Sequence, residues 1–209
     1  MTTAATRYLH LVRHGEATPD ESGLTGNGRR QAALLGHRLR GVPFAAVHHG
    51  PLPRAEETAR LIHAELADGI PLHRTESAGG YAPTSRAGTN SRRNRPTSSS
   101  ASSKAPPEEQ EQGAAPARRA LDRFTGPVEG EGGEDRHELV VTHNFLVAWL
   151  VRDAMRAPAW RRLGLNHANA ALTVIRYAPG RPATVLPAND MRHLPADLRW
   201  TGLPPELHI

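Results

Sequence analysis

Two stretches decide the fold of this 209-residue chain: RYLHLVRHG at residues 7–15 and ELVVTHNF at residues 138–145. In each, an aliphatic and β-branched run predicts a strand, over residues 7–12 and 138–142, and a histidine follows within two residues. Ligands of open α/β sheets bind beyond the carboxyl ends of the strands. We therefore expect His14 and His143 to face each other across one crevice.

Helices and strands alternate in the sequence around these stretches. Thr25 is a suitable N-cap for a helix over residues 26–40, and Pro51 and Pro53 open a second helix. An apolar helix follows at residues 145–155, and further strands are expected at residues 45–48, 71–74, 171–177 and 183–186. This alternation predicts one α/β domain over residues 1–209, with an open, mostly parallel sheet.

The segment at residues 82–113 differs from the rest of the chain. It contains seven of the nine serines and almost no apolar residue large enough for a core, so its composition predicts a disordered or aberrant low-complexity insert. One hypothesis is that residues 84–104 are translated out of frame, because the shifted frame permits an acidic loop and an apolar helix face. The alternative is a natural insertion, and the coding DNA distinguishes the two.

The charge of the chain is concentrated in the same segment. The formal net charge is +5 and the isoelectric point is near 10.6, values that invite a nucleic-acid partner. Five basic residues and no acid lie within residues 84–104, however, and the remaining basic residues equal the 21 acidic ones in number. The basicity therefore reflects one solvated segment, and no nucleic-acid partner is expected.

Several classes of site and location are disfavoured by what the sequence lacks. Without cysteines there are no disulfides, thiolate metal sites or cysteine nucleophiles, and no H-E-x-x-H motif indicates a metal site. The longest apolar run, residues 145–151, is too short to span a membrane, and no signal peptide is evident. We therefore expect a cytoplasmic protein with no metal, no other cofactor and no membrane partner.

Four motifs in chain order resemble those of the histidine phosphatase superfamily, the phosphoglycerate-mutase-like proteins, and of its phosphatase branch in particular. They are RHGE at residues 13–16, LT-x-x-G-x-x-QA at 24–32, PL-x-RA-x-x-TA at 51–59 and VTHN at 141–144. The resemblance covers residues 7–81 and about 109–209. It implies a three-layer α/β/α sandwich that hydrolyses small-molecule phosphate monoesters through a phosphohistidine.

The resemblance also implies a role for each motif residue. His14 would be the nucleophile, and Arg54 together with Arg13 would bind the phosphate through forked donors. His143 would bind the phosphate and stabilise charge during transfer, with Asn144 as a further phosphate ligand. The alternative for Arg54 is a surface ion pair with Glu57 on its own helix and no role in catalysis, a contact worth only about 0.3–0.5 kcal/mol.

The acid that protonates the leaving group is assigned to Glu76. The stretch TESAGGY at residues 75–81 resembles the family's acidic position, a glutamate after the third strand that a glycine and an aromatic residue follow. Glu16 is the alternative acid. Protonation is required because an alkoxide is a poor leaving group.

Two other functions stay open at this stage. A mutase would return the phosphoryl group to the substrate, but such enzymes of the family carry RHG-x-S-x-x-N, whereas ATPD follows RHGE here at residues 17–20. A catalytically impaired pseudoenzyme would bind phosphate without forming a phosphohistidine. The sequence does not specify the substrate or the oligomeric state.

Overall fold

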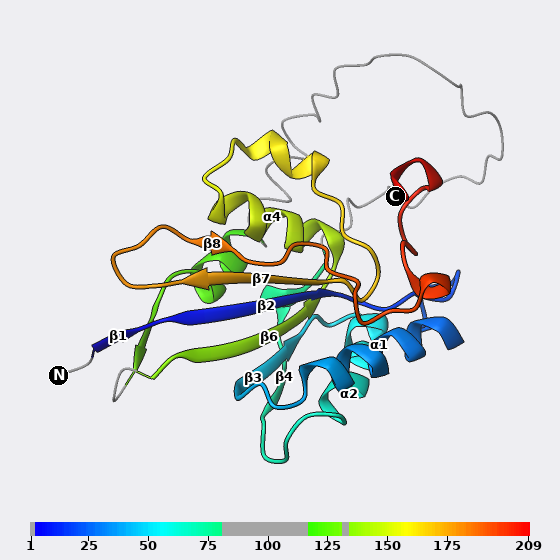
Figure 1. Ribbon diagram of the computed structural model, residues 1–209, viewed down its shortest axis with the longest axis horizontal. Helices are drawn as coiled ribbons and strands as arrows, with labels where there is room; N and C mark the ends of the chain where they lie inside the picture. The colour runs from blue at the N-terminus through cyan, green and yellow to red at the C-terminus, as the bar shows by residue number, and fades with distance from the viewer. Residues whose placement is uncertain (1–2, 81–116, 131–133) are drawn as a thin grey trace.

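The computed structural model describes residues 3–80, 117–130 and 134–209 (Figure 1). The expected insert at residues 82–113 lies outside these ranges, and so does the segment of the out-of-frame hypothesis, residues 84–104.

Six strands form the central sheet in the described part of the chain, in the order β4-β3-β6-β2-β7-β8. Strands β2, β6, β3 and β4 are parallel, whereas β7 and β8 are antiparallel additions at one edge, which confirms the mostly parallel sheet. Their bounds are β2 (Arg7–Arg13), β3 (Phe44–His49), β4 (Leu72–Arg74), β6 (Arg136–Thr142), β7 (Leu172–Tyr177) and β8 (Thr184–Val185).

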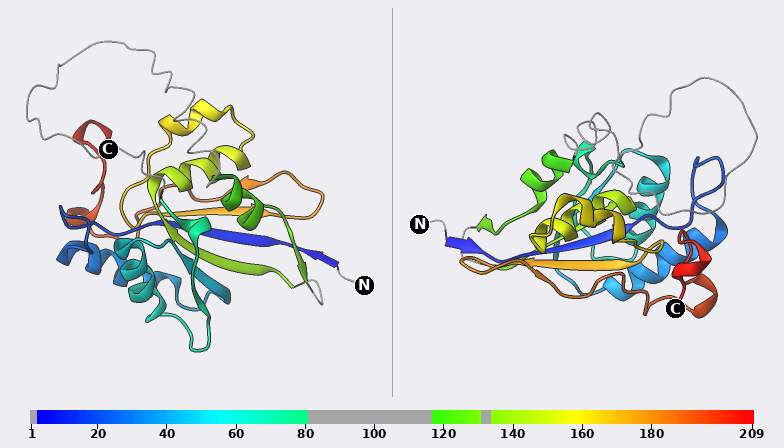
Figure 2. Two further views of the ribbon diagram at one scale, coloured as in Figure 1. Left: turned by 180° about the vertical axis from the view of Figure 1, so that it is seen from behind. Right: turned by 90° about the horizontal axis from the view of Figure 1, so that it is seen from above.

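Helices cover both faces of the sheet, so the molecule has the expected three α/β/α layers (Figures 1 and 2). Helices α1 (Gly26–Leu39) and α2 (Pro53–His63) pack on one face, and α4 (Asn144–Ala154) packs with helical residues 117–124 on the other. No described helix is both long and apolar enough to cross a membrane.

Short elements complete the fold and were not expected from the sequence. Strands β1 (Thr3–Ala5) and β5 (Val128–Gly130) form a separate antiparallel ribbon. The 3-10 helices are η1 (Glu76–Ala78), η2 (Ala159–Gly164), η3 (Ala196–Leu198) and η4 (Pro205–Leu207). All of these elements except the six-residue η2 have three residues, too few to show a periodicity, which explains why they were missed.

The register between β2 and β6 places the two motif histidines together. Arg13 lies opposite Thr142 in this parallel pair, and the backbone N–H of His14 donates to the Thr142 carbonyl at 2.9 Å. His14 and His143 are therefore the next residues beyond the carboxyl ends of adjacent strands.

The start of α1 is packed against the loop that follows β2. Thr25 caps the helix as expected, its hydroxyl accepting from the Gly28 N–H at 3.0 Å. A Cβ atom on Gly28 would lie 2.1 Å from the Glu16 carbonyl oxygen, so only glycine permits this approach. Buried Gln31 accepts from the Glu16 N–H at 2.9 Å. The LT-x-x-G-x-x-QA motif thus fixes the backbone next to His14.

We predict that Gly28→Ala destabilises the protein by about 1–3 kcal/mol, the usual cost of overpacking, because its methyl group collides with backbone. Gly26→Ala, at the start of the same helix, is the matched control, since a Cβ there meets nothing within 4 Å. Urea unfolding of the two variants measures the difference. Equal free energies of unfolding would contradict the proposed contact.

Candidate active site

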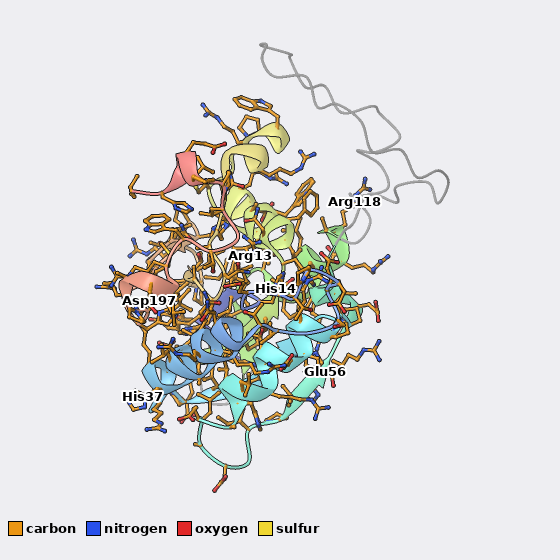
Figure 3. The ribbon with its side chains drawn as sticks, turned by 90° about the vertical axis from the view of Figure 1, so that its right-hand side faces the viewer. Arg13, His14, His37, Glu56, Arg118 and Asp197 are labelled. Atoms are coloured by element: carbon orange, nitrogen blue, oxygen red, sulfur yellow. The ribbon has the colours of Figure 1, made fainter. Side chains whose placement is uncertain are left out.

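A cavity of about 590 Å³ lies beyond the carboxyl ends of β2 and β6. Its wall contains the expected nucleophile, His14, and every phosphate-binding residue predicted from the sequence, namely Arg13, Arg54, His143 and Asn144. Figure 3 views the molecule from this side, with Arg13 and His14 labelled near the middle and His37 and Asp197 toward the edge. The motifs, far apart in sequence, therefore converge on one site.

His14 is held as a neutral ring by hydrogen bonds at both of its nitrogens. Its Nδ1–H donates to the Gly15 carbonyl oxygen at 2.7 Å, and its Nε2 accepts from Nε–H of Arg54 at 3.2 Å. The pKa of His14 is lowered to about 4, mainly by burial and also by the charges of Arg13 and Arg54, against the opposing effect of the Gly15 bond. At neutral pH the Nε2 lone pair therefore points toward a cationic group.

His143 faces His14, the nucleophile expected from the sequence. The two ring centroids are 5.0 Å apart and the planes are inclined by 61°. Burial lowers the pKa of His143 to about 3, with His14 and the arginines adding to the effect, so this ring is also neutral. Its Nε2 is buried and has no hydrogen-bond partner within the described residues. A Cβ on Gly80 would lie 2.7 Å from the ring, so glycine is required beside it.

Two arginines supply positive charge to the cavity. Arg13 Nη1 donates to the carbonyl oxygens of His167, at 2.7 Å, and Gly202, at 3.0 Å. Burial, with Arg54 nearby, lowers the pKa of Arg13 to about 10, which leaves it charged at neutral pH. Arg54 lies only 13% exposed beside His14 and pairs with Glu21 at 3.1 Å.

The alternative pairing of Arg54 with Glu57 is wrong. The Glu57 carboxylate instead accepts from Arg29 Nε at 2.6 Å and from the Leu24 N–H at 2.8 Å. Glu57 therefore secures the loop that precedes α1, and Arg54 is left to face the cavity.

A loop before β7 completes the wall, and the sequence interpretation missed it. Asn169 Nδ2 donates to the carbonyl oxygens of His14, at 2.9 Å, and Gly15, at 3.3 Å. Asn144 Oδ1 accepts from the His167 N–H at 2.8 Å, so this side chain ties the loop to α4. The available signal was the polar stretch NHAN at residues 166–169, directly before an apolar strand.

The structure does not bring Glu76 to the cavity. Glu76 is exposed at the start of η1 and is not part of the cavity wall. The carboxylates in the wall, among the residues that the structure describes, are Glu16 and Glu21. The alternative acid, Glu16, is therefore in place, and Glu21 was not foreseen.

Comparison with known families agrees with this geometry. The sequence profile of the histidine phosphatase superfamily (branch 1) matches residues 9–190. The chain belongs to this superfamily. The serine/threonine-protein phosphatase Pgam5, mitochondrial, of Caenorhabditis elegans is 30% identical over 91% of the chain, and its Rattus norvegicus counterpart is 27% identical over 92%. The chain spans 65% and 66% of these two proteins.

Solved structures show the same fold. Bacillus stearothermophilus YhfR superposes with a TM-score of 0.63 at 20% identity, covering 90% of this chain and 98% of that one. The phosphoglycerate mutase of Plasmodium falciparum gives a TM-score of 0.61 at 18% identity, with 92% and 96% covered. The phosphoglycerate-mutase-like fold of this superfamily member is therefore confirmed.

The expectation of a cytoplasmic location is contradicted. The curated relatives are named as mitochondrial proteins in worm, rat and human. The expectation depended on missing cysteines and on the absence of an evident signal peptide, and neither observation identifies a compartment.

The lowered histidine pKa values predict the pH dependence of the site. In an NMR titration, His14 should change charge near pH 4, whereas histidines of the urea-unfolded chain should do so at about pH 6.5. Since the unfolded chain then binds more protons, stability should fall as the pH drops from about 6.5 to 4, by up to ~1.4 kcal/mol per pH unit for each such histidine. A His14 midpoint near 6.5 in the folded protein would refute this.

Proposed function

We propose that the protein hydrolyses phosphate monoesters through a phosphohistidine on His14. The observation that carries the proposal is the state of the His14 ring: Nδ1–H is bound to Gly15, and Nε2 accepts from Arg54. A neutral imidazole in this tautomer has one lone pair available for attack on phosphorus. The names of the relatives, which are phosphatases, support the same reaction.

In the proposed reaction the two arginines first offset the dianionic phosphate. Arg54 Nε–H would pass from His14 Nε2 to a phosphoryl oxygen, releasing the lone pair at the moment of binding. Arg13 would contribute the other cation, and His143 a ring N–H toward the charge that develops on the transferring group. Asn144 is the remaining proposed ligand, placed in the wall at the start of α4. Water then hydrolyses the phosphohistidine.

The leaving oxygen must receive a proton, and two glutamates are candidates. Glu16 lies in the cavity wall, directly after the RHG motif. Glu76 lies outside it, four residues before Gly80, which does line the cavity. The geometry favours Glu16, and we propose it as the acid, with Glu76 as the alternative that the sequence motif supports.

The proposed substrate is a small phosphate ester. A second candidate is phosphoserine or phosphothreonine in proteins, because the curated relatives are named serine/threonine-protein phosphatases. Assays of ethyl phosphate and of a phosphoserine peptide, side by side on the purified chain, distinguish the two substrate classes.

We predict that His14 carries the covalent phosphate. Acid-labile, base-stable label should appear on His14 after brief incubation with a 32P-labelled ester, and His14→Ala should abolish both label and turnover. Exposed His37 on α1 provides the control, since His37→Ala should leave both unchanged. Label that persists in His14→Ala would exclude the assignment, and phosphate binding without any label in the wild type would identify a pseudoenzyme.

We also predict that substitutions of Glu16 and Glu76 differ in how their effect on the rate depends on the leaving group. Glu16→Gln should slow an alkyl phosphate by about 10²–10⁴-fold, as expected for loss of a general acid, and slow p-nitrophenyl phosphate far less. Glu76→Gln should behave like the wild type on both esters. The reverse pattern would assign the acid to Glu76, and equal losses on both esters would point to a role other than protonation.

A further inference from the structure

The carboxylate of Glu21 is bound to the same guanidinium that contacts the nucleophile. Arg54 Nε donates to His14 Nε2 at 3.2 Å, while Arg54 Nη1 donates to Glu21 at 3.1 Å. The Arg54 side chain is 13% exposed and that of Glu21 is 68% exposed, so the pair runs from the buried nucleophile toward solvent. Glu21 also belongs to the cavity wall.

The loop that carries Glu21 holds it firmly. An isolated β-bridge between Ala17 and Leu24 closes the base of the loop. Within it the Glu21 N–H donates to the Thr18 carbonyl at 2.8 Å, and Asp20 accepts from the hydroxyls of Thr18, at 2.6 Å, and Ser22, at 2.9 Å.

Glu21 itself has a φ of 59°, a left-handed conformation that is uncommon for a residue other than glycine. The bonded loop around it therefore fixes an unfavourable backbone geometry. From this backbone the Glu21 carboxylate reaches Arg54 Nη1 at 3.1 Å.

Binding of a phosphate ester changes the partners of this carboxylate. Arg54 and Arg13 together match the two negative charges of the phosphate, and phosphoryl oxygens compete with Glu21 for the Arg54 donors. With in-line attack by His14 the leaving group points away from the ring, and Glu21 is bound to Nη1 of Arg54, a different nitrogen from the Nε that contacts His14. Because Glu21 lines the same cavity, the alcohol part of the ester is expected to enter the field of a carboxylate that has lost its cation.

We propose that Glu21 is a specificity-determining residue that selects phosphate esters whose alcohol carries an ammonium group and disfavours those that carry a carboxylate. The proposal rests on the proposed phosphatase function and extends it to a substrate class. An ammonium group restores the charge balance at Glu21, whereas a carboxylate adds repulsion. Because the Glu21 side chain is 68% exposed, one such attraction or repulsion at about 4–6 Å in an aqueous dielectric changes affinity about 3–6-fold, and the two together change the ratio of affinities about tenfold or more.

Three esters of matched size test the charge preference: 2-aminoethyl phosphate, ethyl phosphate and carboxymethyl phosphate. For the wild type we expect kcat/KM to fall in that order, mainly through KM. In Glu21→Gln the ratio of kcat/KM for 2-aminoethyl phosphate to kcat/KM for carboxymethyl phosphate should drop about tenfold. Asp20→Asn is the matched control, because this neighbouring carboxylate is bound to Thr18 and Ser22, and the ratio should not change.

Binding measurements keep the charge preference separate from catalysis. Calorimetry of the three esters with His14→Ala, alone and combined with Glu21→Gln, should show the same order of affinity and the same loss of selectivity. If no ester is turned over but this order holds, the phosphatase function fails and the role of Glu21 stands. The proposal would be overturned if Glu21→Gln left the order of affinity unchanged or if Asp20→Asn altered it equally. It would also be overturned if the wild type preferred the carboxylate ester or bound none of the three esters.

Discussion

The parallel pairing of β2 with β6 is the interaction on which the site depends. It aligns Arg13 with Thr142 and extends one hydrogen bond past the strand end, from His14 N–H to the Thr142 carbonyl. Both histidines inherit their positions from this register. A shift by one residue would turn each strand's side chains to the opposite face, so the hydrophobic pattern that fixes the register also fixes the distance between the two rings.

Burial sets the protonation states of the two histidines that this register places together. Desolvation keeps His14 and His143 neutral beside two cations, whereas exposed imidazoles would be protonated at mildly acidic pH. The neutral rings leave the arginines as the positive charges of the phosphate pocket. In the proposed reaction the nucleophile is therefore a neutral imidazole, and the groups that stabilise the charge of the dianion are the two arginines.

The sequence predicted the parts of the fold that depend on local signals. The strand before RHG and the helix capped by Thr25 end within one residue of their expected bounds, and the second helix begins at Pro53 as expected. Side chains whose role depends on tertiary neighbours were not predictable. Asn169 and Glu21 become part of the cavity only because a loop near β7 and a strained turn happen to meet Arg13 and Arg54. Glu76 shows the converse: the local sequence motif predicts it in the site, but the packed structure leaves it outside the cavity.

The carbonyl of Gly202 on Arg13 joins residues 189 positions apart in the chain. A Cβ on Gly202, which has a φ of +78°, would lie 2.2 Å from Asn169 Oδ1, so this late segment is fitted tightly against the earliest catalytic motif. During synthesis the ribosome makes the RHG motif long before the carbonyls of His167 and Gly202 that orient its arginine. A nascent chain therefore carries His14 before the wall of the cavity around it is complete, and the proposed phosphate site forms only when the segment around Gly202 has docked.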